Sequence, residues 1–186
     1  MSAKLLYLTQ HPLDPPVAGS SSHSRFIFQA IRTYYDEAHL IYYHRPDTID
    51  KESNFYRHHF DSVHIIPKPQ EKPNIAYDDK DNILDEWFSE DLETALRQVR
   101  DNLGIVDCLL VDYVWLSKAF SLIHAKLNIL NVHDLFANRR KLMTRVSGKN
   151  TWFSCSKSDE IKGFNRADLN LFISFDFSEF MPEVRA

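Results

Sequence analysis

Short apolar runs recur along the chain and stop at polar or proline positions. Each run has the length of a buried strand. The predicted strands are Lys4–Thr9, His39–Tyr43, Val63–Ile66, Asp107–Val111, Asn128–Val132 and Leu169–Ile173. The run Asp107–Val111 is almost wholly apolar, which is typical of a parallel strand that is covered on both faces.

Between these runs, apolar residues recur at the three- and four-residue spacing of a helix. After the first strand, the serines of Ser20–Ser24 offer N-caps for a helix with one apolar stripe. The members of this stripe are Phe26, Ile27, Ala30, Ile31 and Tyr34. A second helix is predicted between Ser89, as N-cap, and Gly104, as the C-terminal stop. Its apolar positions are Leu92, Leu96, Val99 and Leu103.

Two shorter helices are predicted in the second half of the chain. One covers Leu116–His124, directly before the fifth strand. The other begins at Ser156 with Asp159, and Gly163 is expected to weaken it because glycine disfavours a helix interior.

The alternation of strands and helices predicts an α/β fold built from βαβ units. We expect a Rossmann-like parallel sheet of about six strands with helices on both faces. The length of 186 residues fits one domain, so residues 1–186 are expected to form a single unit.

Composition and charge exclude several classes of protein. The formal net charge is −4, from 22 Lys plus Arg and 26 Asp plus Glu, so no basic excess favours nucleic acid as a partner. Two cysteines, Cys108 and Cys155, are too few for a disulfide framework or a Cys-rich zinc site. No run approaches the ~20 apolar residues that span a bilayer. We therefore expect a soluble protein in the reducing cytoplasm.

The loop that follows the first strand is a candidate anion site. It leads through Gly19 and Ser20 into a helix, and the free backbone N–H groups at a helix N-terminus favour a phosphate. The loop lacks both Gly-x-Gly-x-x-Gly and the P-loop Gly-Lys-Ser/Thr. An ordinary strand–helix connection therefore remains an open alternative.

Polar residues also follow the fourth and fifth strands, where an open α/β sheet binds its ligands. Asp112 comes directly after the fourth strand, and His133, Asp134 and Arg139 come after the fifth. His133 could give a substrate a hydrogen bond or a positive charge. The alternative, that His133 only caps a helix or satisfies a backbone carbonyl, stays open.

The order of these segments resembles the N-terminal half of GT-B glycosyltransferases of the family 4 type. The resemblance covers nearly the whole chain. Its most specific parts are the His-Asp-Leu-Phe-x-x-Arg segment from His133 to Arg139 and the Ala-Asp-x-x-x-x-x-Ser segment that begins at Ala167.

The resemblance implies retaining transfer of a sugar from a nucleotide-diphosphate donor, without a metal or another cofactor. Backbone amides at Gly19 and Ser20 would approach the donor diphosphate, with Ser20 standing where the family usually has a second glycine. His133 would be the catalytic residue, contacting the donor sugar near the reacting centre. Asp134 would orient His133 or cap the next helix. Asp112 and Arg139 complete the implied substrate-binding set, and Arg139 has no assigned role.

The resemblance also implies partners that the chain itself does not contain. A GT-B enzyme has a second, C-terminal domain that supplies most of the nucleotide-sugar site, and no second sheet follows here. We expect the chain to hold the acceptor side, with a glycan or a lipid-linked acceptor of bacterial polysaccharide or envelope synthesis. The basic cluster Arg139–Lys141 with Arg145 could meet anionic lipid or a phosphorylated acceptor. Peripheral contact with the inner face of the membrane is therefore part of this expectation. A solvated surface is the simpler interpretation of the cluster.

Two other functions remain open from the sequence. The first is a non-catalytic α/β module that binds a partner protein or a small anion, for which the Pro-containing loop Lys68–Asp81 would serve. The second is another Rossmann enzyme, such as a dehydrogenase. The missing Gly-x-Gly-x-x-Gly after the first strand disfavours it.

Overall fold

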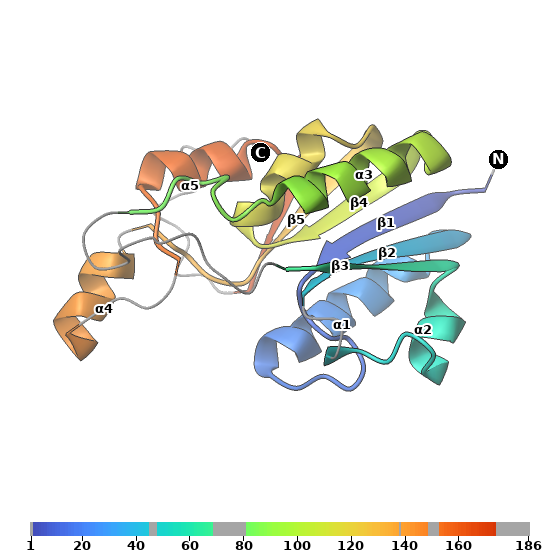
Figure 1. Cartoon of the computed structure of the whole chain (residues 1–186), viewed down its shortest axis with the longest axis horizontal. Helices are drawn as coiled ribbons and strands as arrows, with labels where there is room; N and C mark the ends of the chain where they lie inside the picture. The colour runs from blue at the N-terminus through green and yellow to red at the C-terminus, as the bar shows by residue number, and fades with distance from the viewer. Residues whose placement is uncertain (1, 45–47, 69–80, 138, 149–152, 174–186) are drawn as a thin grey trace.

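The computed structural model describes residues 2–44, 48–68, 81–137, 139–148 and 153–173 of the chain. The loop that the sequence analysis placed at Lys68–Asp81 lies almost entirely outside the described residues. The described segments form one sheet with a helical layer on each face (Figure 1).

The sheet has six strands, in the order β3-β2-β1-β4-β5-β6, and every neighbouring pair is parallel. The strands are β1 (Lys4–Thr9), β2 (Glu37–His44), β3 (Ser62–Pro67), β4 (Val106–Asp112), β5 (Ala125–Val132) and β6 (Leu169–Phe172). This is the strand order of the doubly wound Rossmann fold. The predicted fold class is therefore confirmed, and all six predicted strands are found.

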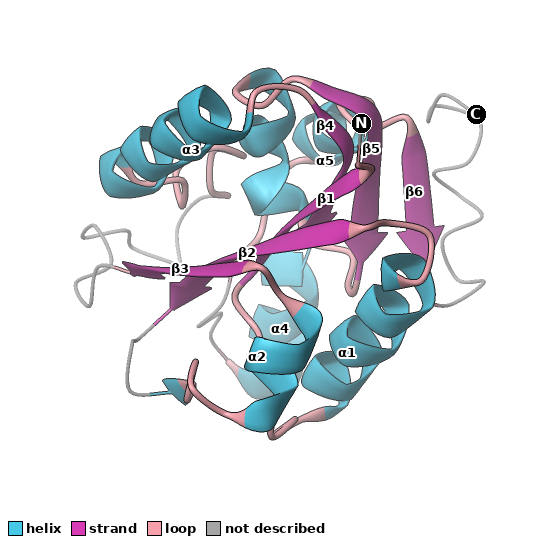
Figure 2. Cartoon of the chain, turned by 90° about the vertical axis from the view of Figure 1, so that its right-hand side faces the viewer, coloured by secondary structure: helices cyan, strands magenta, loops and turns pink. Residues whose placement is uncertain are grey.

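Helices cover both faces of the sheet (Figure 2). One face carries α1 (Gly19–Arg32) and α2 (Asn54–His59). The opposite face carries α3 (Glu90–Leu103), the 3₁₀ helix η2 (Val114–Ser121) and α5 (Lys157–Phe164). The remaining helix, α4 (Arg139–Ser147), projects beyond the carboxyl ends of the strands, at the left of Figure 1. None of these helices has the length and apolar character needed to span a bilayer.

Each face of the sheet has its own hydrophobic core because side chains alternate along a strand. In β4, Leu109 and Val111 pack with the α3 side, whereas Cys108 and Leu110 pack with the α1 side. All four are completely buried, and each such Leu contributes about 1.5–3 kcal/mol.

The predicted caps of two helices are confirmed. The Ser89 hydroxyl accepts a hydrogen bond from the Leu92 amide at 3.2 Å, and α3 ends at Gly104, which has φ +68°. In the same way, Ser156 caps α5 by accepting from the amide of Asp159 at 3.1 Å.

The apolar stripe predicted for α1 is wrong in part. Phe26 and Tyr34 are 67% and 81% exposed, whereas Ser21, Ser24 and Phe28 are buried. Ile27 and Ile31 do pack against the core on this face of the sheet. The helix is therefore rotated so that Ser21 and Ser24 face the sheet. The Ser24 hydroxyl donates a hydrogen bond to Asp112, whereas the Ser21 hydroxyl has no hydrogen-bond partner among the described residues.

Two further details differ from the sequence prediction, and Gly163 has a role that the sequence did not indicate. The helix expected at Leu116–His124 is the 3₁₀ helix η2, which begins earlier, at Val114, and β5 then begins at Ala125. Gly163 lies inside α5 at its contact with η2, and a Cβ there would stand 2.3 Å from Val114 Cγ2. Gly163 therefore permits close packing of the two helices, beyond any effect on helix propensity.

Candidate functional site

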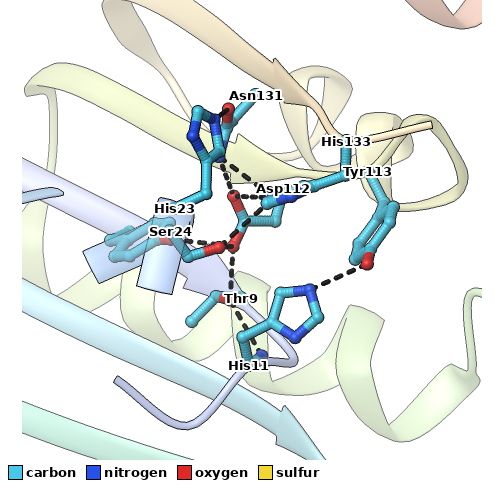
Figure 3. A network of polar contacts seen from close by, with 9 residues as sticks. Thr9, His11, His23, Ser24, Asp112, Tyr113, Asn131 and His133 are labelled. Carbon is cyan, nitrogen blue, oxygen red and sulfur yellow. Dashed lines mark hydrogen bonds and ion pairs between the residues drawn. The ribbon is translucent and has the colours of Figure 1, made fainter. Parts of the chain in front are cut away.

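The candidate site lies at the carboxyl ends of β1, β4 and β5, beside the first half of α1 (Figure 3). β4 lies between β1 and β5, so the last residues of all three strands meet at one edge. Asp112 stands opposite Asn131 in the pairing of β4 with β5. Thr9 ends β1, and His133 directly follows β5.

A buried carboxylate, Asp112, is the centre of the site. It is completely inaccessible to solvent. Its partners are Tyr7 Oη at 2.7 Å, Thr9 Oγ1, Ser24 Oγ at 2.9 Å, Asn131 Nδ2 at 2.7 Å and His133 Nε2 at 3.2 Å. A buried charge without such partners would be strongly unfavourable, so the surrounding hydroxyl, amide and imidazole groups are what keep the carboxylate in place.

His133 is held mainly through one of its ring nitrogens. Its Nε2 lies 3.2 Å from Asp112 Oδ1, 3.2 Å from Ser24 Oγ and 3.1 Å from Asn131 Nδ2. Contact with the Asp112 carboxylate favours a proton on Nε2, so the Asn131 Nδ2, itself a donor, is a neighbour of Nε2 and not its hydrogen-bond acceptor. Nδ1 is then an acceptor in the neutral ring. Nδ1 is buried and has no hydrogen-bond partner among the described residues. Such an unsatisfied buried atom calls for an explanation, and a bound ligand is one.

Three more rings surround His133. The ring centroids of His11, His23 and Tyr113 lie 5.2, 5.3 and 4.6 Å from that of His133. His11 Nε2 lies 2.8 Å from the Tyr113 hydroxyl, and His23 Nε2 lies 3.1 Å from Asn131 Oδ1. The site therefore combines one permanent carboxylate with several imidazole and hydroxyl groups, which come from α1, from β1, β4 and β5, and from the residues just after these strands.

Burial and charge set the protonation states. Burial opposes the charged form of Asp112, but the neighbouring His133 and His11 hold the pKa of this carboxyl well below its usual range. Burial lowers the pKa of His11 to about 4, although Asp112 opposes that shift. At neutral pH, Asp112 is therefore ionised and His11 is neutral.

Tyr113 is held in an unusual backbone conformation next to Asp112. Its φ is +66°, which costs a non-glycine residue on the order of 1–3 kcal/mol. Its ring stacks on Trp115, with centroids 4.2 Å apart and planes 11° apart. The surroundings thus impose a conformation that sets the Tyr113 hydroxyl at the site.

The N-terminus of α1 opens on the same edge of the sheet. The N-cap Ala18 provides no side-chain cap, and no acidic residue occupies the first turn. A Cβ at Gly19 would meet nothing within 4 Å, so the space in front of it is open. Ser20 is close enough to Tyr113 to lower the pKa of that hydroxyl, against burial, which raises it. The first-turn amides are therefore available to an anion near the His133 cluster.

The structure brings together most of the residues singled out in the sequence. Gly19, Ser20, Asp112 and His133 belong to one edge of the sheet. No hydrogen bond joins Asp134 to His133 among the described residues, and Asp112 and Ser24 contact the His133 ring instead. The other expectation, that Asp134 caps the next helix, stays a prediction. The Asp134 side chain is half exposed and lies 3.7 Å from that of Arg139.

Sequence reasoning missed several members of the cluster. They are Tyr7, Thr9, His11, His23, Ser24, Tyr113 and Asn131. Five of these lie inside β1, β5 or α1, whereas the residues predicted from the sequence were those that directly follow a strand. Asn131 and His133 are two residues apart, as are Tyr7 and Thr9, so the two-residue period of a strand was the signal available.

The described residues contain no group of three or more His, Cys, Asp or Glu side chains arranged to hold a metal ion. Comparison with known proteins gives no match: no protein-family model, curated protein or solved structure is significantly similar to this chain.

Proposed function

We propose that this chain is the acceptor-side half of a retaining glycosyltransferase that moves a sugar from a nucleotide-diphosphate donor to a glycan or lipid-linked acceptor. One observation carries the proposal: the buried Asp112–His133 pair lies on the same edge of the sheet as the uncapped N-terminus of α1. The His133 imidazole, which would contact the sugar, and the free amides of α1, which would bind the diphosphate, would then line one cleft.

The chemistry follows from these groups. As the bond between the sugar and the diphosphate breaks, negative charge grows on the departing phosphate and positive charge on the sugar ring. The free amides of Gly19 and Ser20 would stabilise the departing anion. His133 would hydrogen-bond a sugar hydroxyl, and Asp112 would fix its ring and balance any positive charge on it.

The proposal includes partners outside the described residues. A second, nucleotide-binding domain would hold most of the donor, so this chain alone is expected to transfer sugar negligibly. Bacterial polysaccharide or envelope synthesis, at the cytoplasmic side of the membrane, remains the proposed setting.

The helix α4 supports peripheral contact with an anionic membrane. Its cations and its two exposed apolar residues are Arg139, Arg140, Lys141, Arg145, Leu142 and Val146. Leu142 and Val146, four residues apart, are 60% and 74% exposed. A basic helix with exposed apolar side chains is typical of segments that bind at a lipid surface.

Activity of a two-domain enzyme that contains this chain tests the proposed function. The enzyme should transfer sugar from one of a panel of nucleotide sugars, and His133→Ala should lower the rate by about 100-fold or more. Full activity of the His133→Ala enzyme would contradict the role of His133. Binding of pyrophosphate without any transfer would instead favour the non-catalytic anion-binding module.

A further inference from the structure

A second buried carboxylate, Glu160, lies outside the His133 cluster. It belongs to α5, and no part of it is exposed to solvent. Its two oxygens accept hydrogen bonds from two consecutive backbone amides: Oε1 from Phe136 at 2.7 Å and Oε2 from Ala137 at 2.8 Å. A helix on one face of the sheet thereby holds the segment that joins β5 to α4.

This segment connects two residues of the proposed site. His133 precedes it, and Arg139 follows it as the first residue of α4. The Phe136 carbonyl accepts a hydrogen bond from the Arg139 amide at 3.2 Å, and the Arg139 guanidinium lies 5.2 Å from the centre of the Phe136 ring. Whatever fixes the backbone of Phe136 therefore also fixes the start of α4.

The Phe136 side chain extends the same connection to the site. It is completely buried, with its ring centroid 4.7 Å from that of Trp115 and 6.2 Å from that of Tyr113. Tyr113 in turn packs on His133. Phe136 is thus in contact with the ring cluster on one side and with Arg139 on the other.

We propose that Glu160 is a positioning residue of the proposed site, which sets the place of Arg139 relative to the His133 cluster by holding the amides of Phe136 and Ala137. This inference rests on the proposed function for its ligand. The geometry requires a carboxylate, because only a group with two acceptor oxygens satisfies both amides. A glutamine would accept from one and place its own N–H₂ against the other.

The surroundings of Glu160 make this arrangement dependent on pH. Burial raises the pKa of Glu160 to about 7, while the two amides and Arg139 oppose the shift and Asp134 adds to it. Cys155 interacts electrostatically with Glu160, and also with Asp159 and Asp81. Protonation near neutral pH removes the charge that strengthens both amide hydrogen bonds, so the hold on Arg139 should weaken as the solution becomes acidic.

The first test follows the amides themselves in the ¹⁵N-labelled chain. The amide proton shifts of Phe136 and Ala137 should titrate together with a midpoint near pH 7, and this step should vanish in Glu160→Gln. If neither amide titrates between about pH 5 and 9, and neither amide shift changes in Glu160→Gln, Glu160 does not hold this segment and the proposal is overturned.

The second test measures the dissociation constant of inorganic pyrophosphate at pH 8 in a double-mutant cycle of Glu160→Gln and Arg139→Ala. Glu160→Gln should weaken binding by about two- to tenfold, the effect of one ordinary hydrogen bond, and should add nothing in the Arg139→Ala background. A matched control is Asp168→Asn. Asp168 directly precedes β6 and accepts from the Asn128 amide, in the middle of β5, at 2.7 Å, so its loss should leave pyrophosphate binding unchanged.

The outcomes separate this proposal from the proposed function. The positioning role would be overturned if Glu160→Gln left the dissociation constant of pyrophosphate unchanged. It would also be overturned if Glu160→Gln weakened binding as much in the Arg139→Ala background as in the wild type. If the wild-type chain binds no pyrophosphate, the anion site of the proposed function fails, and the amide titration alone then decides whether Glu160 holds the segment.

Discussion

Two aspartates on the same strand show how different the two ends of the sheet are. Asp107 lies near the start of β4 and Asp112 at its end. Asp107 accepts from the Lys126 ammonium at 2.6 Å and from the Lys4 amide at 2.8 Å, at the surface of the molecule. Asp112 is completely buried, and among the described residues it contacts hydroxyl, amide and imidazole groups and no lysine or arginine.

The difference between the two aspartates indicates which end of the sheet is the candidate functional site. An ion pair at the surface, such as that of the partly buried Asp107 with the 70% exposed Lys126, contributes little to stability. A buried carboxylate with no permanent counter-charge costs folding free energy. The hydroxyl and imidazole groups around it have fixed orientations and differ from one another in protonation state. The end with Asp112 also has the open N-terminus of α1. The carboxyl end of the sheet is therefore the place to look for a ligand.

The largest effect is expected when Asp112 is removed. Asp112→Ala leaves several buried donors without an acceptor and should lower the free energy of unfolding by about 3–5 kcal/mol, measured by urea denaturation. Asp107→Ala is the control on the same strand and should cause only a small change. Equal losses from the two substitutions would show that the two ends of β4 do not differ in this way.

The second effect concerns pH, through Glu160. The pKa of Glu160 is raised to about 7 in the folded protein, above its ordinary value of 4.5. The contribution of Glu160 to the free energy of unfolding is therefore complete below pH 4.5 and is lost as the pH rises from 4.5 through 7. The unfolding free energy of the wild type should therefore fall relative to that of Glu160→Gln between about pH 4.5 and 7, by up to about 3 kcal/mol. A constant difference across this range would contradict the raised pKa.

Substitutions at two glycines distinguish an effect on packing from an effect on ligand access. Gly163→Ala should lower the free energy of unfolding by about 1–3 kcal/mol, because its Cβ would collide with Val114. Gly19→Ala meets open space and should leave stability nearly unchanged, yet it should weaken pyrophosphate binding by narrowing the approach to the first-turn amides. Equal binding in wild type and Gly19→Ala would show that no anion approaches that turn.

The smallest effect is expected for membrane contact by α4. Replacing Arg145 with Gln should weaken binding to vesicles that contain phosphatidylserine by about fivefold, since one basic residue near such a surface contributes about 1 kcal/mol. Lys126→Gln changes the charge equally at the opposite end of the sheet and is the matched control. The same loss in both variants, or none in Arg145→Gln, would argue against contact through α4.

The sequence was sufficient to predict the sheet and insufficient to predict the His133 cluster. Runs such as Asp107–Val111 identify buried strands by themselves, and Ser89 with Gly104 marks the ends of α3 by local chemistry. The rotation of α1 could not be found in this way, because Phe26 and Tyr34 have the right spacing for a core and the buried Ser24 does not. Only the position of Asp112 across the sheet explains why a serine faces inward.

Glu160 illustrates the same limit at longer range. Within α5 it looks like an ordinary acidic residue in the first turn, a place that suits the helix dipole. Its true partners are backbone amides of Phe136 and Ala137, far away in the sequence. Such partners leave no trace in the side-chain pattern. His133 and Gly19, by contrast, could be located because strand ends and helix starts share one edge in any parallel sheet.

The most direct test of the account is an NMR titration of the ¹⁵N-labelled chain with inorganic pyrophosphate, followed at the backbone amides and the histidine ring nitrogens. The account predicts that the shifts concentrate at Gly19, Ser20 and the ring of His133. It would be contradicted if these signals stayed still while others moved, for instance those of the amino-terminal edge near Lys4 and Lys126, or if nothing moved at all.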